Sequence, residues 1–328
     1  MNEILITRSA GLRYRNDGPL VVSDVDLVVS TGSALGIVGE SGSGKTSLSR
    51  LLVGVLPPTE GEVLIDGAPW HTVKRRDQNR RRVQMVFQDP YGSLNPWMPV
   101  RDAVAEPIQY WQGITRRAAR DKASELLAET GLSEDFIDRR PTELSGGQCQ
   151  RAGIARALAC DPDVLVADEP TSSLDVSVQA QILNLLVTLR QQRGLALVLV
   201  SHDLSVIRYA TDDAIVMYGG KVVEHGPTKE LLAAPRHPYT RILVDSIPGK
   251  EGGMHMAPAT PQPGHWCVFA SLCPNLQADC VDRPVSFKNA ARGAACAHPL
   301  PDQALNHEAA TRLQSTHVGR SSAFGIGQ

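Results

Sequence analysis

The stretch Gly39-Glu40-Ser41-Gly42-Ser43-Gly44-Lys45-Thr46 decides the fold of this 328-residue chain. The apolar run at 34–38 before it predicts a short buried strand. After it we expect a helix that ends at Pro57-Pro58 and buries one apolar face, formed by Leu48, Leu51, Leu52 and Val55. In such a unit, successive backbone N–H groups turn towards an anion, and the helix dipole adds to their field. The stretch therefore predicts a site for the phosphates of a nucleotide.

Two side chains of this loop carry specific chemistry. Lys45 can reach the β- and γ-phosphates, and the hydroxyl group of Thr46 can ligate Mg²⁺. We expect the nucleotide to contact the loop through Gly39, Ser41, Gly42, Ser43, Gly44, Lys45, Thr46 and Ser47.

The composition argues against some classes of function. The chain is 42% hydrophobic and 21% charged, with a net charge of −2, which is typical of a soluble globular protein. A near-neutral charge argues against nucleic acid as a partner, because duplex binding needs an excess of Lys and Arg on one face. We interpret the basic runs at 74–76 and 80–82 as a solvated surface.

The sequence also predicts the compartment. The first residues lack the basic and apolar regions of a secretory signal. The longest clean apolar run, at 195–200, has six residues and is far too short to span a membrane. We therefore expect a soluble, cytoplasmic protein whose six cysteines are free or metal-bound rather than paired in disulfides.

Strand and helix patterns alternate along the chain. Alternation of period two in the first 33 residues predicts antiparallel strands. Farther on, strands are predicted at 61–67, 82–87, 163–167 and 195–200, helices at 115–131, 151–159 and 178–194, and a hairpin around Gly219-Gly220. This order predicts an α/β fold, with a mainly parallel sheet, helices on both faces and ligands at the carboxyl ends of the strands.

The composition changes near residue 235, towards Pro, Gly, Cys and His with little periodicity. We therefore expect one large domain at 1–235 and a smaller unit at 236–306. The last stretch, 307–328, has few large apolar residues and is predicted to be a mobile tail.

Polar side chains follow the predicted buried strands. Asp168 and Glu169 end the strand at 163–167, where one carboxylate can hold Mg²⁺ and the next can accept a proton from an attacking water. His202 follows the strand at 195–200 and can face the γ-phosphate, and the amide oxygen of Gln88 can ligate Mg²⁺ or the water.

A second helix start has the features of an anion site. Leu144-Ser145-Gly146-Gly147-Gln148 opens the helix at 151–159 with exposed N–H groups, a hydroxyl group and no bulky side chains. One nucleotide could be held by both helix ends of the same chain, or by helix ends from two chains.

Seven motifs in this order and spacing resemble those of the ATP-binding subunit of ABC transporters, over residues 1–235: Tyr14, Gly39–Thr46, Gln88, Leu144–Gln148, Val164–Glu169, Ser173–Asp175 and His202. The resemblance implies the P-loop ABC-type fold, with an antiparallel β subdomain and a helical subdomain that carries Leu144–Gln148. It also implies that Tyr14 stacks on adenine and that Thr46 and Gln88 ligate Mg²⁺, with support from Asp168. Glu169 would then be the general base, and His202 and Lys45 would contact the γ-phosphate.

The same resemblance implies a head-to-tail dimer of ATPase subunits. Ser145, Gly146, Gly147 and Gln148 would close over the ATP of the partner subunit, and Ser173–Asp175 would link the two sites. Hydrolysis would then depend on closure of the dimer.

A narrower resemblance concerns the branch of peptide and nickel importers. It rests on Arg236-His-Pro-Tyr-Thr-Arg241, Ile247-Pro248 and the stretch Gln84–Pro96. It implies an ATPase that energises import of dipeptides or oligopeptides from the cytoplasmic face of the cell membrane; nickel or another small polar cargo is the alternative. The implied partners are a second ATPase chain, forming a heterodimer, two transmembrane permease subunits and an extracytoplasmic peptide-binding protein.

Four cysteines lie in the smaller unit, at Cys267, Cys273, Cys280 and Cys296. Four thiolates can hold zinc or an iron–sulfur cluster, or stay free, and the absence of a C-x2-C pair weakens the zinc reading. Their spacing, with Phe269 and His298 close by, resembles that of peptide-importer ATPases with a 4Fe–4S cluster. We expect such a cluster to brace the extension, and we expect Cys149 and Cys160 to be buried small residues.

The sequence argues against two other classes of protein. A soluble ABC ATPase that acts on nucleic acid is disfavoured by the single nucleotide domain and the net charge of −2. A sensor module in which ATP only switches conformation is disfavoured by the complete set Asp168, Glu169 and His202.

Overall fold

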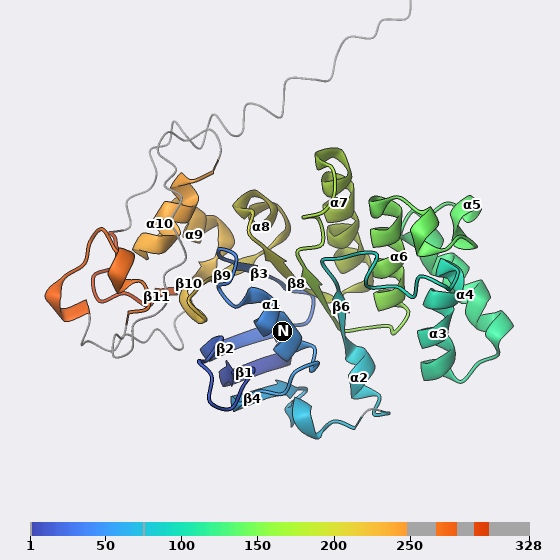
Figure 1. Ribbon diagram of the computed structural model, residues 1–328, viewed down its shortest axis with the longest axis horizontal. Helices are drawn as coiled ribbons and strands as arrows, with labels where there is room; N and C mark the ends of the chain where they lie inside the picture. The colour runs from blue at the N-terminus through green and yellow to red at the C-terminus, as the bar shows by residue number, and fades with distance from the viewer. Residues whose placement is uncertain (1, 75, 248–266, 281–291, 302–328) are drawn as a thin grey trace, which may run out of the picture.

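The computed structural model describes residues 2–74, 76–247, 267–280 and 292–301. Arg75, Pro248 and the predicted tail at 307–328 lie outside these residues. The chain forms two sheets with a group of helices beside them (Figure 1). Across the described part of the chain, every helix is too short or too polar to cross a membrane.

A seven-stranded sheet forms the centre of the molecule, in the order β11-β10-β9-β3-β8-β7-β6. The five strands from β9 to β6 run parallel, and β10 and β11 are antiparallel additions at one edge. Their bounds are β3 Ala34–Val38, β6 Val83–Val86, β7 Val164–Asp168, β8 Ala196–Ser201, β9 Asp213–Tyr218, β10 Lys221–Pro227 and β11 Gly293–Ala294. The predicted parallel sheet and the Gly219-Gly220 hairpin are confirmed.

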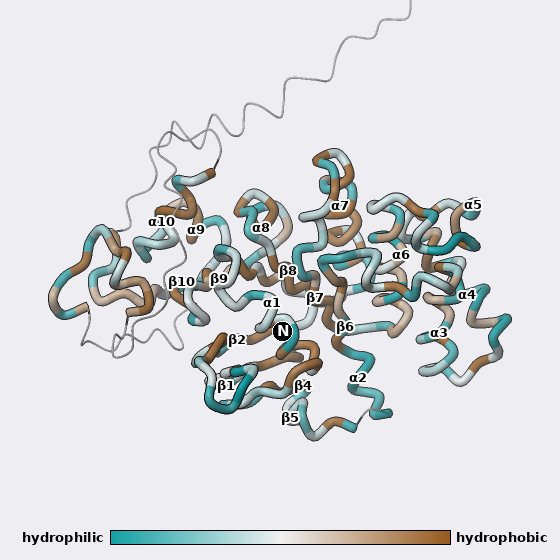
Figure 2. Tube along the Cα trace, in the orientation of Figure 1, coloured by the Kyte–Doolittle hydropathy of each residue, from teal (hydrophilic) through white to brown (hydrophobic). Residues whose placement is uncertain are grey.

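Both faces of this sheet are buried, which explains why its strands are continuous apolar runs. In β8, Leu197 and Leu199 join one core cluster, and Val198 and Val200 join the cluster on the opposite face. Figure 2 shows hydrophobic residues concentrated in these central strands. The strands are thus held by side chains on two sides, and their carboxyl ends form a fixed edge.

A four-stranded antiparallel sheet covers one face, in the order β2-β1-β4-β5. Its strands are β1 Glu3–Leu12, β2 Val22–Ser30, β4 Glu60–Ile65 and β5 Ala68–Pro69. The two strands expected in the first 33 residues are β1 and β2, which pair as predicted. This sheet packs over the helix that follows the glycine-rich loop, since Leu5, Val25 and Leu51 share a core cluster.

The helix α1, Lys45–Leu52, starts in the loop itself. Leu48, Leu51 and Leu52 are fully buried, as expected, but Val55 is 61% exposed and lies beyond the helix. The helix ends before Pro57 because Gly54 adopts a positive φ of 67° and lies close against the Trp70 ring. The predicted end and the fourth apolar contact were therefore wrong.

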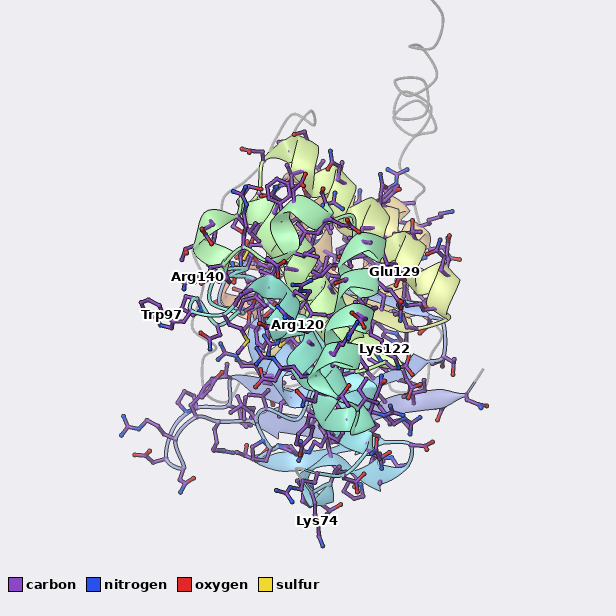
Figure 3. All side chains as sticks on the ribbon, turned by 90° about the vertical axis from the view of Figure 1, so that its right-hand side faces the viewer. Lys74, Trp97, Arg120, Lys122, Glu129 and Arg140 are labelled. Carbon is purple, nitrogen blue, oxygen red and sulfur yellow. The ribbon has the colours of Figure 1, made fainter. Side chains whose placement is uncertain are left out.

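A separate helical group lies at one end of the molecule (Figure 1). It contains α3 Val100–Gln112, α4 Arg116–Glu129, α5 Glu134–Ile137 and α6 Gly146–Leu158, around a core of their own. The Thr115 hydroxyl accepts a hydrogen bond from the Ala118 amide at 3.3 Å, so the predicted start of α4 is confirmed. In Figure 3, Arg120, Lys122 and Glu129 lie along this group, and Trp97, 80% exposed, projects from the loop before α3.

The remaining helices lie beside the central sheet. They are α2 Asn79–Arg82, α7 Val176–Arg193, α8 Leu204–Ala210, α9 Thr228–Ala233 and α10 Pro238–Asp245. The boundary predicted at residue 235 falls between α9 and α10. Tyr239 and Phe269, from beyond that boundary, are fully buried in the main core cluster.

Part of the basic run is more than a solvated surface. The guanidinium group of Arg80 lies over the Trp70 ring, 4.7 Å from its centroid. Arg82 donates to Asp163 and, at 2.9 Å, to Asp66. These two arginines therefore tie α2 to neighbouring segments, a role that the charge run alone does not reveal.

Candidate nucleotide site

The glycine-rich loop connects β3 to α1 and fits closely against the β9–β10 hairpin. A Cβ atom on Gly39 would lie 2.3 Å from the Met217 carbonyl oxygen, and one on Gly44 would lie 2.7 Å from that of Val21. Gly42 and Gly44 have positive φ values of 82° and 101°, which L-residues with side chains rarely adopt. Only glycine fits these positions, so the loop holds the shape that an anion cradle requires.

Lys45 lies inside this loop. Its ammonium group donates to the carbonyl oxygens of Gly39 at 2.7 Å and Glu40 at 2.8 Å. Burial lowers the pKa of Lys45, against the opposing effect of the Glu169, Asp168 and Glu40 carboxylates. The buried hydroxyl of Ser43 has no hydrogen-bond partner among the described residues. An ammonium group and an unpaired hydroxyl in a ring of amides fit a polyphosphate.

The carboxyl end of β7 and the first turn of α1 bring Asp168 and Thr46 together. The Thr46 hydroxyl donates to Asp168 Oδ1 at 3.4 Å. Asp168 is 2% exposed, and burial raises the pKa of its carboxyl group, while the Thr46 hydrogen bond and the Lys45 charge oppose that rise. A hydroxyl and a carboxylate at one point are the hard oxygen ligands that Mg²⁺ binds, so the residues present fit this ion.

Glu169 forms the centre of a second group. Its Oε2 atom accepts from Gln88 Nε2 at 3.2 Å and lies 3.4 Å from His202 Nδ1. Its backbone has a φ of 44°, a left-handed conformation that is strained for a residue with a side chain and is often found at functional sites. The structure thus brings Gln88, Glu169 and His202 together from three separate segments.

The structure also places an aromatic ring at the loop. The Tyr14 hydroxyl lies 3.1 Å from Ser47 Oγ, and the ring is 54% exposed. The side chain is thus beside the glycine-rich loop and open to a ligand, as the predicted contact with adenine requires.

The segment Leu144–Gln148 lies apart from the glycine-rich loop of the same chain. Ser145 caps α6, accepting from the Gln148 amide at 3.3 Å, while the Gln148 side chain accepts from the Ser145 amide at 2.9 Å. A Cβ on Gly146 or Gly147 would meet Leu174 or Val178, the region of the predicted Ser173–Asp175 link. Figure 1 shows α6 in the helical group and α1 beneath the central sheet.

The loop after β6 contacts both Glu169 and the segment Leu144–Gln148. Gln88 touches Glu169, and three residues later the Tyr91 hydroxyl donates to the Leu144 carbonyl at 3.0 Å. Cys149, buried in the core of the helical group, also donates from Sγ to the Pro90 carbonyl at 3.3 Å. The role of Tyr91 was not predicted from the sequence, because a single tyrosine in a loop gives no signal. Ser172, whose Oγ lies 3.4 Å from Gln88 Nε2, was also not predicted, because a single serine gives none either.

The four cysteines of the extension meet at one small cavity. Cys267, Cys273, Cys280 and Cys296 line it together with His237 and Phe269. Burial raises the pKa of Cys296 to about 11, and the neighbouring thiols add to this rise. Cys149 and Cys160 are buried elsewhere, as predicted.

Comparison with known proteins gives two family matches. Residues 22–172 match the ABC transporter family, and residues 223–280 match the family described as the oligopeptide/dipeptide transporter C-terminal region. The second match includes three of the four cysteines and the segment 236–241.

Similar proteins and structures agree with these matches. The probable D,D-dipeptide transport ATP-binding protein DdpF of Escherichia coli is 45% identical over 79% of this chain and 83% of that protein. The oligopeptide transport ATP-binding protein AppF of Bacillus subtilis is 41% identical over 86% of this chain and 90% of that protein.

Among solved structures, the ATP-binding cassette MJ0796, a dimer in a post-hydrolysis state bound to ADP and Pi, matches with a TM-score of 0.63 and 30% identity, over 69% of this chain and 99% of that chain. The glycine-rich loop, the acidic pair and the two family matches lead to one conclusion. The chain belongs to the ABC transporter family, as an ATPase subunit of the branch that carries the oligopeptide/dipeptide transporter C-terminal region.

Proposed function

We propose that this chain is the ATP-hydrolysing subunit that energises import of dipeptides or oligopeptides across the cytoplasmic membrane. The observation that carries this proposal is the combination, in one chain, of an ABC transporter ATPase region with the C-terminal region of oligopeptide and dipeptide transporters. The names of relatives such as DdpF and AppF, which refer to dipeptide and oligopeptide transport, support the class of cargo.

Each side chain at the nucleotide site has a proposed role. The loop Gly39–Thr46 and Ser47 bind the phosphates of ATP, and Tyr14 stacks on adenine. Lys45 leaves the loop carbonyls, 2.7 Å and 2.8 Å away, to neutralise the β- and γ-phosphates. Thr46, Gln88 and Asp168 would hold Mg²⁺, which neutralises phosphate charge when it is bound.

Glu169 accepts the proton of the attacking water. Its carboxylate already receives a hydrogen bond from Gln88 and lies next to His202, so both neighbours orient it. His202, whose side chain is 57% exposed, is available to contact the γ-phosphate.

We further propose that the active unit is a head-to-tail dimer of ATPase subunits, with a different ATPase chain as the partner. Within one chain, Gly146 and Gly147 lie against Leu174 and Val178, while Ser145 and Gln148 hydrogen-bond to each other. These four residues would read the ATP of the partner subunit. The MJ0796 cassette is a dimer in its solved structure, which supports this arrangement.

Two permease subunits and an extracytoplasmic peptide-binding protein would complete the importer, with this chain on the cytoplasmic face of the membrane and no nucleic acid bound. Trp97, 80% exposed just before α3, is proposed as a contact for a permease subunit. We also propose the division into a domain at 1–235, an extension at 236–306 and a tail at 307–328.

A 4Fe–4S cluster is proposed for the four-cysteine cavity. Four sulfurs on one zinc ion lie about 3.8 Å apart, given a Zn–S distance of about 2.3 Å. Among the described residues, the one compact set of candidate ligands is Asp279, Cys280 and His298, so no three of the four Sγ atoms lie within 4.8 Å of one another. Sulfurs farther apart than this do not match the tetrahedron of one zinc ion.

Anaerobic purification with iron, sulfide and zinc analysis tests this cluster. We expect about four iron atoms per chain and broad visible absorbance, both lost in Cys273→Ser and kept in the control Cys160→Ser. One zinc atom and no iron would instead assign a single ion to Asp279, Cys280 and His298.

The import function is tested by purifying the tagged chain from detergent-solubilised membranes and identifying the proteins that accompany it. We expect two multi-span proteins and a second ATPase. Reconstituted in vesicles, this complex should hydrolyse ATP faster with a peptide-loaded binding protein than with an empty one. Stimulation by nickel but not by peptides would overturn the peptide assignment, and recovery of nucleic acid without membrane proteins would overturn transport.

A further inference from the structure

The C-terminal extension reaches the nucleotide site through one side chain. Tyr239 lies in α10, in the segment 236–241, and is fully buried. Its hydroxyl group accepts a hydrogen bond from the backbone amide of Glu40 at 3.0 Å, across 199 residues of sequence. Glu40 is the second residue of the glycine-rich loop, so the extension contacts the loop directly.

The two peptide units that flank the Glu40 Cα atom hold Lys45 through their carbonyl oxygens, that of Gly39 and that of Glu40. The Glu40 carbonyl oxygen accepts from the Lys45 ammonium at 2.8 Å and from the Ser43 amide at 3.2 Å. A shift of the backbone around Glu40 therefore moves the loop and its lysine together. The hydrogen bond from the Glu40 amide to the Tyr239 hydroxyl fixes the preceding peptide unit, whose carbonyl oxygen, that of Gly39, accepts from the Lys45 ammonium at 2.7 Å.

The phenol ring of Tyr239 is held on several sides. Its centroid lies 4.6 Å from that of Tyr218 and 5.5 Å from that of Phe269. The start of α10 is fixed too, because His237 Nδ1 accepts from the Tyr239 amide at 3.1 Å.

Behind that helix start lies a buried carboxylate. Glu224 is fully buried and accepts from the amides of Arg236 at 2.9 Å and His237 at 2.8 Å. Burial also raises the pKa of the Tyr239 hydroxyl, which therefore stays protonated. The hydroxyl group is thus a rigid, neutral contact at a defined position.

From this geometry we propose that Tyr239 is a positioning residue of the ATP site: the extension holds the glycine-rich loop through the Glu40 amide and so sets its affinity for ATP. This inference rests on the proposed ATP site. It assigns to the extension a part in nucleotide binding, in addition to any part it has in cargo transport or in the four-cysteine cavity.

The test is Tyr239→Phe, which removes one oxygen atom and keeps the ring. ATP affinity is measured by calorimetry with Mg²⁺ on the full chain, and KM and kcat on the purified transporter. We expect ATP to bind about five-fold more weakly, as the loss of one hydrogen bond predicts, and KM to rise with kcat within two-fold. The matched control is Tyr209→Phe, which removes a hydroxyl group that joins α8 to Asn184 of α7. This variant should bind ATP like the parent chain.

Two further variants separate the possible failures. Phe269→Leu keeps the hydroxyl but removes the ring beside it, and should weaken ATP binding by about two-fold. Lys45→Ala tests the ATP site itself. If Lys45→Ala weakens binding and Tyr239→Phe lowers only the melting temperature, Tyr239 is merely structural and the inference is overturned. If Lys45→Ala also leaves binding unchanged, the ATP site itself is wrongly assigned.

Discussion

The close approach of the glycine-rich loop to β9 gives a prediction whose size follows from the structure. In Gly39→Ala, the new methyl group would lie 2.3 Å from the Met217 carbonyl oxygen and 2.8 Å from Ser43 Oγ. Because real Cβ atoms essentially never come closer than 3.0 Å to such atoms, the loop and the strand must separate by about 0.7 Å. Met217 is fully buried in a strand that pairs on both sides, so the loop is the part that moves.

This movement displaces the groups that are proposed to bind phosphate. Gly39 provides one of the two carbonyl oxygens on Lys45, and the next peptide unit provides the other. A misplacement of about 1 Å can cost about 100-fold in rate. For the smaller shift here, we expect kcat/KM for ATP to fall about 10- to 100-fold, equivalent to about 1.4–2.7 kcal/mol.

The assay is steady-state ATP hydrolysis by the purified transporter, with circular dichroism as a check on folding. Gly153→Ala is the matched control, because its methyl group would meet only Ser93 Oγ at an ordinary 3.4 Å inside α6. It should leave ATP hydrolysis unchanged and the chain slightly more stable. Wild-type kcat/KM in Gly39→Ala, with normal folding, would refute the reasoning that contact with β9 sets the position of the loop.

Three further predictions concern the charged side chains. Glu169→Gln keeps the size of the side chain but removes its basicity. ATP affinity should stay within two-fold of the parent while kcat falls about 100- to 10,000-fold. Near-parental turnover would exclude Glu169 as the base. Lys45→Ala should weaken ATP binding at least ten-fold in calorimetry, whereas Glu62→Gln, at an exposed ion pair, should leave it unchanged. Since burial raises the pKa of Asp168, its charged form costs stability in the nucleotide-free chain, and stability is lost as pH rises through the folded pKa. Asp168→Asn should therefore raise the free energy of unfolding at pH 7, measured by urea titration, and this gain should shrink towards pH 4. A gain that does not depend on pH would show that the buried charge of Asp168 is not its cause.

The sequence was informative where the signal is local. The buried strands were recognised because a strand covered on both faces must be apolar at every position, as in β8. The start of α4 was recognised because a threonine hydroxyl can satisfy a free amide at a helix start. The end of α1 was placed too late, because the contact between Gly54 and Trp70 that ends the helix joins distant segments.

Several helices, among them α3, α8, α9 and α10, were not predicted from the sequence. The helix α3, Val100–Gln112, contains Pro107, which normally argues against a helix interior. Its buried face, including Val104 and Ile108, packs into the core of the helical group and outweighs that local penalty. Tertiary packing decided the structure of this segment.

By itself, the sequence determined the chemistry of the site: an ammonium group, hydroxyls and carboxylates in motifs whose order identifies the family. The tertiary structure alone decided how these groups meet. It joined Gln88, Glu169 and His202, gathered four widely spaced cysteines around one cavity, and set Tyr239 against Glu40. The physical reason is that periodicity and turn chemistry act over a few neighbouring residues, whereas contacts between distant segments are fixed only when the whole core closes around them.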